Sequence, residues 1–421
     1  MHALPKPRRI RLAIVSPAPP RACPVAGYTE ELTRMLHAVA PEIAPSLWAI
    51  THDSEMPAAG GLAAAGVIRI DDPSAYRRAG LRMHRLGACA ALLQYGPGTA
   101  GGPHGRYLLG LTNELDRLHL PYLVTLHGLR PSMHPDDADT ATALCRNAAG
   151  IIVLSRSARA ALMHNRLAPA ERVAVIAQGA PPELSDTQIG DSTPAVAEIL
   201  ARVQRGPLLT TIGHLRPAKG IEVGITALPL LAARHPGVRY VVAGRTHDDQ
   251  TRLTGEWYRD TLVRAAESLG VPDRLILVGT DPTPADLAAL LHATDVYLAP
   301  DLDRGRTSAG SLSYALAAGR PVVAAANPFA HEVVPHRGGH LVAPGDPAAL
   351  ATAVDRLLVD RTNHSKRWPS SVAMAEQIAG LVGLITGRAD TRNQRTVGPA
   401  APRSREDRYN TRARAARATT G

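Results

Sequence analysis

Short apolar runs recur along this chain, and helix-length stretches separate them. This rhythm constrains the possible fold more than any other feature of the sequence. Short runs rich in Val, Ile and Leu are typical of parallel strands that helices bury on both faces. In the first half, such runs lie at residues 10–15, 46–50, 88–93, 122–126, 150–154 and 172–176. The first half therefore predicts one α/β domain, whose helices include residues 28–39 and 106–117.

The same rhythm restarts after a polar, proline-containing segment, which predicts a linker between two domains. Predicted strands follow at residues 208–212, 239–243, 275–278, 296–299, 321–325 and 340–342. Predicted helices lie at residues 221–234, 257–269, 285–293, 311–318, 346–359 and 365–386. With 421 residues, the chain is long enough for two hydrophobic cores. We predict an α/β fold of two Rossmann-like domains, at 8–185 and 207–364, with a linker at 186–206, a helix at 365–388 and a tail at 389–421.

The net charge of +10 is concentrated at the C-terminal end. From Arg388 onward there are nine arginines against Asp390, Glu406 and Asp407, a net +6, which leaves +4 for the other residues. Because the body is nearly balanced, the sequence does not predict a specific nucleic-acid partner. The tail lacks apolar periodicity, and we expect it to be disordered. It is either a solvated extension or a weak binding patch for anionic lipid, polyphosphate or nucleic acid.

The cysteines and the N-terminus bear on the compartment. Cys23, Cys89 and Cys145 have scattered spacing that fits neither a disulfide framework nor a zinc site. The N-terminal basic residues and the apolar run at 12–15 superficially resemble a twin-arginine export signal, but such signals need about seven or more apolar residues. No stretch approaches the roughly 18 apolar residues that span a bilayer. We therefore expect free thiols and a soluble, cytoplasmic protein.

Two loops that follow predicted strands have features of phosphate sites. In doubly wound sheets, ligands bind at the carboxyl ends of the strands, where helices begin. The loop at residues 211–220 brings His214, Arg216 and Lys219 to a helix start, where cations are unfavourable unless an anion binds. Gly27 would let the backbone approach a ligand at the start of the first helix. The alternatives are a solvated loop at 211–220 and a plain turn at Gly27.

Several blocks of the second half resemble, in order and spacing, the C-terminal half of the retaining family 4 glycosyltransferases. The blocks read GHLRPAKG, VVAGRTH, LILVGTDPTPADLAALLHATDVYLAP, ALAAGRPVVAA, His331-Glu332 and GGHLVAPGDPAALATAV. The segments QYGPGTAGGPHGRYLL, TLHGLRPSMHP and EWYRDTL are similar to those of a bacterial subgroup. The resemblance covers about residues 8–388. It implies the GT-B fold, with an acceptor-side N-terminal domain, a nucleotide-sugar domain and a C-terminal crossover helix.

The resemblance also implies how the donor binds. Lys219 would hold the diphosphate of a UDP- or GDP-sugar, with Arg216 or His214 near the family's usual arginine. Backbone N–H groups of Gly310 and Ser311 would meet the phosphates. The predicted substrate-binding residues are Gly27, Gly213, His214, Arg216, Lys219, Gly279, Thr280, Ser308, Gly310, Ser311, Tyr314 and Glu332.

Two further residues carry roles by the same resemblance. His127 matches the family's sugar-contacting histidine, so His127 and Lys219 are the predicted catalytic residues. A histidine at such a position is otherwise structural. Glu332 matches an acidic position of the family, or it is a charge at a helix start. The turn formed by Gly279 and Thr280 would meet the nucleobase.

The chain departs from the family on the side of the sugar. Two positions that hold glutamates in family members hold Arg306 and Tyr314 here. An upstream glutamate of the subgroup is replaced at Gly305, and a His-Glu pair of the subgroup reads Tyr95-Gly96. Retaining transfer needs groups that orient sugar hydroxyls and stabilise developing charge. The missing acids indicate either altered donor specificity or a degenerate enzyme.

Two clusters could hold a metal ion. Asp301 and Asp303 have the form of the acidic pair that binds divalent metal in the other main glycosyltransferase fold, or they are surface acids. His134 and the three aspartates that follow it could ligate a metal, but clustered aspartates after a proline usually cap a helix. We expect no metal and no other cofactor, because Lys219, Arg216 and helix dipoles can neutralise the leaving diphosphate.

The sequence therefore predicts a glycosyltransferase that moves a hexose from a nucleotide sugar to a glycan or small-molecule acceptor with retention. One alternative is a catalytically degenerate GT-B protein that binds nucleotide or glycan as the partner or regulator of an active enzyme. Another keeps the fold and changes the reaction, as in sugar-nucleotide epimerases and phosphorylases.

Overall fold

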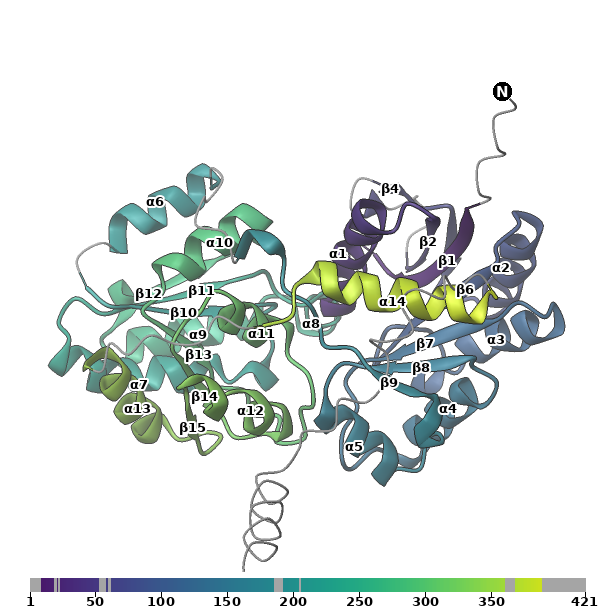
Figure 1. Ribbon diagram of the computed structural model, residues 1–421. Coiled ribbons are helices and arrows are strands. Elements are labelled where there is room, and N and C mark those ends of the chain that lie inside the picture. The colour runs from purple at the N-terminus through teal and green to yellow at the C-terminus, as the bar shows by residue number, and fades with distance from the viewer. Residues whose placement is uncertain are drawn as a thin grey trace, which may run out of the picture.

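The computed structural model describes residues 9–18, 21, 23–52, 58–59, 62–184, 192–203, 206–359 and 368–387. Two α/β domains lie side by side, and a C-terminal helix runs from the second domain onto the first (Figure 1). The predicted tail at residues 389–421, the basic N-terminal segment and part of the predicted linker lie outside the described residues.

The N-terminal domain is built on a parallel sheet of seven strands in the order β5-β2-β1-β6-β7-β8-β9. The strands are β1 (Ile10–Pro17), β2 (Ile43–Thr51), β5 (Gly66–Arg69), β6 (Ala90–Tyr95), β7 (Tyr122–Leu126), β8 (Gly150–Val153) and β9 (Val173–Val175). Every residue of β6 and β7 is buried. A small antiparallel pair, β3 (Ala58–Ala59) and β4 (Leu62–Ala63), lies outside this sheet.

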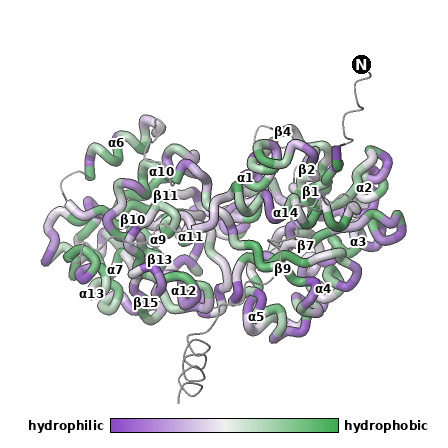
Figure 2. Tube along the Cα trace, viewed as in Figure 1, coloured by the Kyte–Doolittle hydropathy of each residue, from purple (hydrophilic) through white to green (hydrophobic). Residues whose placement is uncertain are grey.

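Helices cover both faces of the first sheet. They are α1 (Pro24–Val39), α2 (Pro73–Arg85), α3 (Leu108–Arg117), α4 (Pro135–Arg146) and α5 (Arg156–His164). On one face, α1 packs beside α14 (Ser371–Ile385), and Leu32 and Ile378 share one buried core. On the other face, α2 to α5 supply a second core that includes Tyr76 and Leu111. Because both faces are covered, the strands are apolar along their length, as the hydropathy colouring shows (Figure 2).

The C-terminal domain repeats this plan with a six-stranded parallel sheet in the order β12-β11-β10-β13-β14-β15. The strands are β10 (Leu208–Ile212), β11 (Arg239–Ala243), β12 (Leu275–Val278), β13 (Val296–Ala299), β14 (Val322–Ala325) and β15 (His340–Val342). The helices are α6 (Pro194–Val203), α7 (Ile221–Arg234), α8 (Asp248–Thr254), α9 (Trp257–Ser268), α10 (Pro284–Ala293), α11 (Gly310–Ala317), α12 (Pro328–Val333) and α13 (Pro347–Val359). Two buried cores lie on opposite faces of this sheet, one under α10 to α12 and one under α7, α9 and α13.

Some elements differ from the sequence-based expectation. Helix α1 begins at Pro24 rather than at residue 28, because a proline suits the first position of a helix, where its missing N–H is not needed. Gly27 therefore lies in the first turn of α1, with open space in front of it. The pattern does not predict β5, because this strand has only four residues and begins with glycine.

The connection between the domains is anchored by an aromatic residue just before α14. Trp368 donates its indole N–H to the carbonyl oxygen of Gln178 at 2.9 Å. Its ring packs edge-on against Phe329, and the Arg337 guanidinium lies 5.0 Å from its centre. The chain thereby returns to the first domain in a fixed direction, and α14 then lies along α1 (Figure 1).

The structure also bears on two expectations about the compartment. Cys23, Cys89 and Cys145 are free thiols, as expected. Within the described ranges, no helix is both long enough and apolar enough to cross a membrane.

Candidate functional site

Loops at the carboxyl ends of the two sheets touch each other across the domain boundary. Thr307, after β13, donates its hydroxyl to the carbonyl oxygen of Leu129, after β7, at 2.6 Å. Ser155, after β8, donates to the carbonyl oxygen of Thr307 at 2.6 Å. Arg130 pairs with Asp303 at 2.9 Å. The strand ends at which ligands bind in doubly wound folds therefore face each other.

Lys219 is the centre of the site in the C-terminal domain. It lies in the turn Pro217–Lys219 between β10 and α7, and the residue is only 9% exposed. Its ammonium group is 3.3 Å from the Ser311 hydroxyl at the start of α11. A Cβ on Gly213 would lie 3.4 Å from the same ammonium group, and the positive φ of Gly213 (126°) favours glycine. The structure thus brings Gly213, Lys219 and Ser311 together.

Helix α11 presents free backbone donors beside this lysine. Its N-cap residue, Ala309, makes no side-chain hydrogen bond to the helix, so the first N–H groups have no side-chain cap. Helices α1 and α7 also lack a side-chain cap, whereas α5 and α12 are capped by Ser155 and Asn327. α1, α7 and α11 follow the central strands β1, β10 and β13. Their N-termini favour an anion at this edge of the two sheets.

A buried ion pair completes the charge around Lys219. Arg306 pairs with Asp301 at 2.9 Å, and their side chains are 10% and 4% exposed. Burial lowers the pKa of Lys219 to about 8; Asp301 opposes this shift, while Arg306 and Arg216 add to it. Because the burial of a cation is costly unless an anion compensates it, the cluster favours an anionic ligand.

The expectation that Asp301 and Asp303 are surface acids is wrong. Asp301 is 3% exposed, and its partner is Arg306. Asp303 is also largely buried, and it accepts the N–H of Gly305 at 3.1 Å besides its pair with Arg130. Both carboxylates therefore balance arginines at the domain boundary. Sequence reasoning missed this network because the loop after β13 folds back on itself.

The other residues predicted to bind the donor lie in the loop after β10 and in the turn after β12. His214 pairs with Asp281 at 3.3 Å, and Arg216 lies close enough to Lys219 to lower the pKa of the lysine. Gly279 and Thr280 follow β12 at the exposed edge of the sheet, where Gly244 donates its N–H to Val278 at 3.2 Å. They lie on the same carboxyl edge as Gly213, with β11 between them.

The side chain of Gln178 lies beside Gly310, the first residue of α11. The sequence did not single out this glutamine. A Cβ on Gly310 would lie 2.5 Å from the Gln178 amide nitrogen, so a side chain at this position would require Gln178 to shift. Gln178 also donates to the Tyr314 hydroxyl at 3.4 Å, and burial raises the pKa of Tyr314 to about 12. Tyr314, in the place of a family glutamate, thus packs against the interdomain segment. Ser308 is half-buried in the same loop.

Glu332 binds the other domain. Its carboxylate accepts the backbone N–H groups of Arg156, at 3.1 Å, and Ser157, at 2.8 Å, at the first turn of α5. Of the two predicted roles, the structure displays that of a charge at a helix start, although the helix belongs to the opposite domain. The contact adds a charge-assisted bridge between the domains.

His127 lies at the end of β7, on the N-terminal side of the boundary. Burial lowers its pKa to about 3, so the imidazole is neutral. Its Nε2 is 2.7 Å from Gln94 Oε1. The centres of the His127 and Tyr28 rings are 4.9 Å apart, and the rings pack edge to face. A Cβ on Gly96 would lie 3.0 Å from the His127 Cβ, so the close approach of the two loops accounts for the glycine there. Gln94 is 1% exposed, and within the described residues its amide nitrogen has no hydrogen-bond partner.

Arg21 is a site residue that the sequence reasoning missed. It follows β1, is 8% exposed and donates to the carbonyl oxygen of Gly98 at 2.7 Å. It also lies 3.4 Å from Asp249, in α8 of the other domain. Among the described residues, its Nε and Nη1 groups have no hydrogen-bond partner. The available signal was its position after the first strand, the same criterion that identified Lys219.

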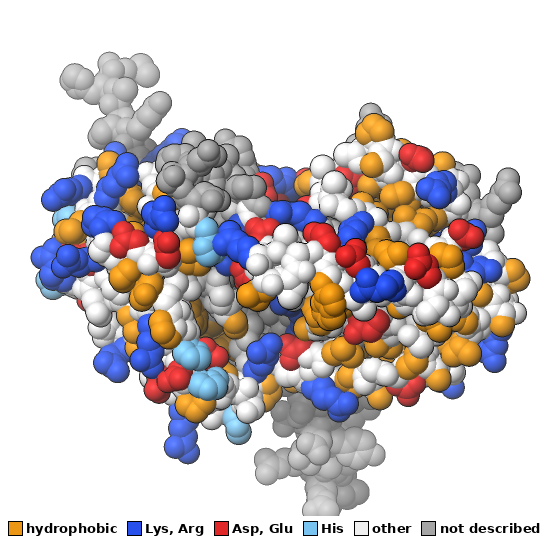
Figure 3. All heavy atoms as spheres, turned by 180° about the vertical axis from the view of Figure 1, so that it is seen from behind, with side chains coloured by type: hydrophobic (Ala, Val, Ile, Leu, Met, Phe, Trp, Pro, Cys, Tyr) orange, Lys and Arg blue, Asp and Glu red, His pale blue; other side chains and the backbone are white. Residues whose placement is uncertain are grey.

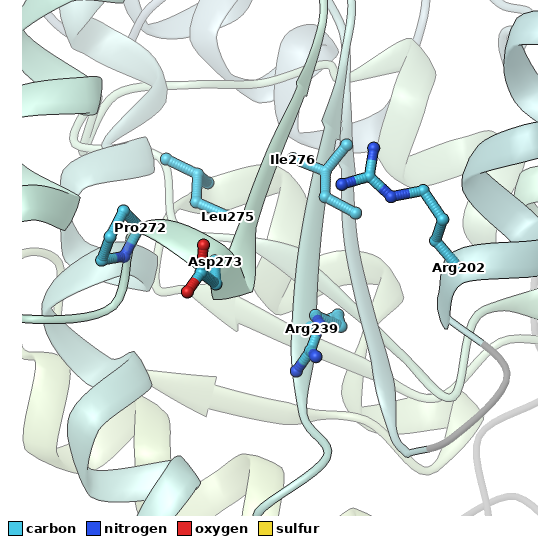
Figure 4. Close-up of a pocket in the computed structure, with 6 residues that line it drawn as sticks. All are labelled: Arg202, Arg239, Pro272, Asp273, Leu275 and Ile276. Carbon is cyan, nitrogen blue, oxygen red and sulfur yellow. The ribbon is translucent and has the colours of Figure 1, made fainter.

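A separate pocket of about 370 Å³ lies at the amino ends of β11 and β12 (Figure 4). It is lined by Arg202, Arg239, Pro272, Asp273, Leu275 and Ile276. This is the edge of the sheet opposite to the Lys219 cluster. Ligands of doubly wound folds bind at the carboxyl ends of the strands, so we assign the functional site to the Lys219 edge.

Comparisons with known proteins agree with this geometry. Residues 194–372 match the family model "Glycosyl transferases group 1". D-inositol 3-phosphate glycosyltransferase of Corynebacterium glutamicum is 29% identical over 58% of this chain and 60% of its own length. The GDP-mannose-dependent alpha-(1-6)-phosphatidylinositol monomannoside mannosyltransferase of Mycobacterium tuberculosis is 32% identical over 43% of this chain and 46% of its own length. The chain therefore spans between about half and three fifths of these relatives.

Solved structures support the fold. The crystal structure of Anabaena HepE in complex with UDP and glucose aligns over 90% of this chain and 98% of its own, with a TM-score of 0.65 at 16% identity. An Escherichia coli trehalose-6-phosphate structure with bound UDP-2-fluoro glucose aligns over 90% of this chain and 96% of its own, with a TM-score of 0.59 at 16% identity. The predicted GT-B fold is confirmed. Residues 194–372 are therefore similar to a glycosyl transferases group 1 domain, and the chain has the fold of GT-B glycosyltransferases.

Proposed function

We propose that this chain transfers a hexosyl group from a UDP- or GDP-sugar to a small anionic acceptor, with retention of configuration. The observation that carries the proposal is the buried Lys219 beside the uncapped start of α11. A nucleotide sugar leaves a diphosphate, and fixed positive charge at that leaving group stabilises the transition state. The free thiols accord with a cytoplasmic enzyme.

The residues divide the chemistry between the two domains. Lys219, Arg216 and the N–H groups of Gly310 and Ser311 would bind the diphosphate, so the departing charge needs no metal ion. The neutral His127 would exchange hydrogen bonds with sugar hydroxyls. Arg306, which stands where the family has a glutamate, adds positive charge near Lys219 while Asp301 balances it. Arg306 would therefore help to bind the leaving diphosphate.

The acceptor side supports an anionic substrate. Arg21 has two buried N–H groups without a partner among the described residues, and a phosphate or carboxylate would satisfy them. The relatives are named for inositol phosphate and phosphatidylinositol acceptors, which are both anionic. We infer that the acceptor of this chain carries an anionic group that Arg21 binds.

Replacement of the buried lysine separates catalysis from folding. We expect Lys219→Met to lower kcat/KM for donor hydrolysis or transfer by about 100-fold or more, because the leaving diphosphate loses its main cation. The melting temperature should stay unchanged or rise, since a buried charge becomes an apolar side chain of similar length. Steady-state kinetics and calorimetric melting check the two outcomes. Full activity in Lys219→Met would contradict the proposal, and donor binding without turnover in wild type would point to the non-catalytic alternative.

Donor binding should depend on pH through Lys219. Its pKa is about 8 in the free protein, so the ammonium form is complete below this value and is lost above it. Binding of an anion favours the protonated lysine, and donor affinity should therefore fall as pH rises above 8, by up to about tenfold per unit. Titration calorimetry between pH 7 and 9.5 measures this change, and Lys219→Arg should flatten the profile. A wild-type profile that is already flat would show that Lys219 does not bind the donor.

The acceptor inference is tested at Arg21. We expect Arg21→Gln to raise the KM for myo-inositol phosphate or another phosphorylated polyol by about tenfold or more, while donor hydrolysis without acceptor stays the same. Arg78→Gln, an exposed arginine of α2 paired with Asp72, serves as the control. If Arg21→Gln leaves the KM of anionic and neutral acceptors equally unchanged, Arg21 has a structural role and the acceptor inference fails.

A further inference from the structure

A histidine cluster outside the transfer site has the geometry of a metal centre. His104 lies in the 3-10 turn η1 (Pro103–Gly105) after β6, and His134 and Asp136 lie at the start of α4. The two imidazole rings stack with their centres 5.0 Å apart and their planes 9° from parallel. Figure 3 shows histidine side chains beside acidic ones low on the N-terminal domain, the part that holds α4.

The distances suit a shared ion better than direct hydrogen bonds. Asp136 Oδ2 is 3.5 Å from His104 Nε2 and 3.6 Å from His134 Nδ1. Both separations exceed the usual hydrogen-bond range. In tetrahedral zinc sites, with zinc–nitrogen bonds of about 2.0–2.1 Å, neighbouring ligand atoms lie about 3.4 Å apart. One carboxylate oxygen therefore stands at ligand spacing from two imidazole nitrogens.

The groups behind these ligands are those that a zinc site requires. His104 Nδ1 is 2.7 Å from Asp137 Oδ1, so this carboxylate accepts the Nδ1 proton and leaves the Nε2 lone pair directed toward Asp136. A carboxylate that orients the histidine in this way is the common outer partner of zinc ligands. Arg106 binds the other oxygen of Asp136 at 3.4 Å, which leaves Oδ2 for an ion.

The backbone at His104 is an independent observation. Its φ is +54°, a left-handed conformation that few non-glycine residues adopt. The Tyr95 hydroxyl donates to the His104 carbonyl oxygen at 3.0 Å and holds this strained turn in place. Strain of this kind gathers at ligand sites.

A structural role for His134 is weaker. Its Nδ1 accepts the backbone N–H of Asp136 at 3.3 Å, which caps α4. This hydrogen bond is long, and Asp136 and Asp137 already place negative charge in the first turn of the helix. The cap does not involve His104, which Asp137 orients.

We propose that His104 Nε2, His134 Nδ1 and Asp136 Oδ2 bind one zinc ion, with water as the fourth ligand. The ion would replace the long hydrogen bond from the Asp136 N–H to His134 Nδ1, and the His134 ring would turn out of the stacked arrangement to direct its lone pair at the ion. The ion would join the segment after β6 to α4. That segment also contains Gly96, which packs against His127, and Gly98, which accepts from Arg21. Zinc would therefore hold the acceptor-side loop in place without taking part in transfer, and the proposal stands independently of the transfer reaction.

The test uses the untagged full chain, freed of metal by a chelator. Titration with Zn²⁺ should give one saturable site per chain, and Co²⁺ in its place should give the intense visible absorption of a tetrahedral centre. His104→Gln should weaken zinc binding at least about tenfold, and Asp137→Asn about tenfold, because the latter removes the group that orients His104.

His119→Gln is the matched control, because His119 is also an exposed histidine with a positive φ (51°), and it should bind zinc like wild type. The absence of a saturable site in wild type would overturn the proposal. So would an affinity that falls equally in His104→Gln and His119→Gln, or a weak octahedral cobalt spectrum. Calorimetry and absorbance read the site directly, so neither result depends on whether the chain transfers sugar.

Discussion

The functional site of this protein depends on one buried ammonium group placed beside a helix that has no side-chain cap. Lys219 loses most of its hydration, and Arg306 and Arg216 repel it further. Asp301 offsets part of this cost, but it is already paired with Arg306. Such an arrangement is costly unless an anion joins it. The free protein therefore holds positive charge already in place at the position where an anion would bind. Electrostatic preorganisation in catalysis works in the same way.

The contacts between the domains lie at the same carboxyl edge of the two sheets. Thr307 and Glu332 meet β7, β8 and α5 of the first domain through hydrogen bonds, and Arg130 meets Asp303 through an ion pair. α14 then packs on α1 of the first domain. The domains are thus joined by polar contacts at the ligand edge and by the apolar packing of α14 on α1.

The sequence predicts the architecture well because buried parallel strands and helix starts leave local patterns. The sequence also predicts the loop of Lys219 as a phosphate site, because its cations lie within a few residues of one another. Contacts that join distant segments leave no such pattern. The contact of Lys219 with Ser311 forms only after the second sheet is assembled. The contact of Glu332 with the start of α5 needs both domains. The Arg306 substitution suggests a loss of function in the sequence alone, but in the structure it belongs to a buried pair with Asp301.

The most direct test of the central claim is hydrogen exchange of the backbone amides with and without UDP, GDP and their sugars, read by mass spectrometry. If the diphosphate binds at the uncapped helix, a nucleotide should slow exchange in residues 213–220 and 308–313 and leave the amino ends of β11 and β12 unchanged. Protection confined to the pocket at Arg239 and Asp273, or no protection at saturating nucleotide, would contradict the account.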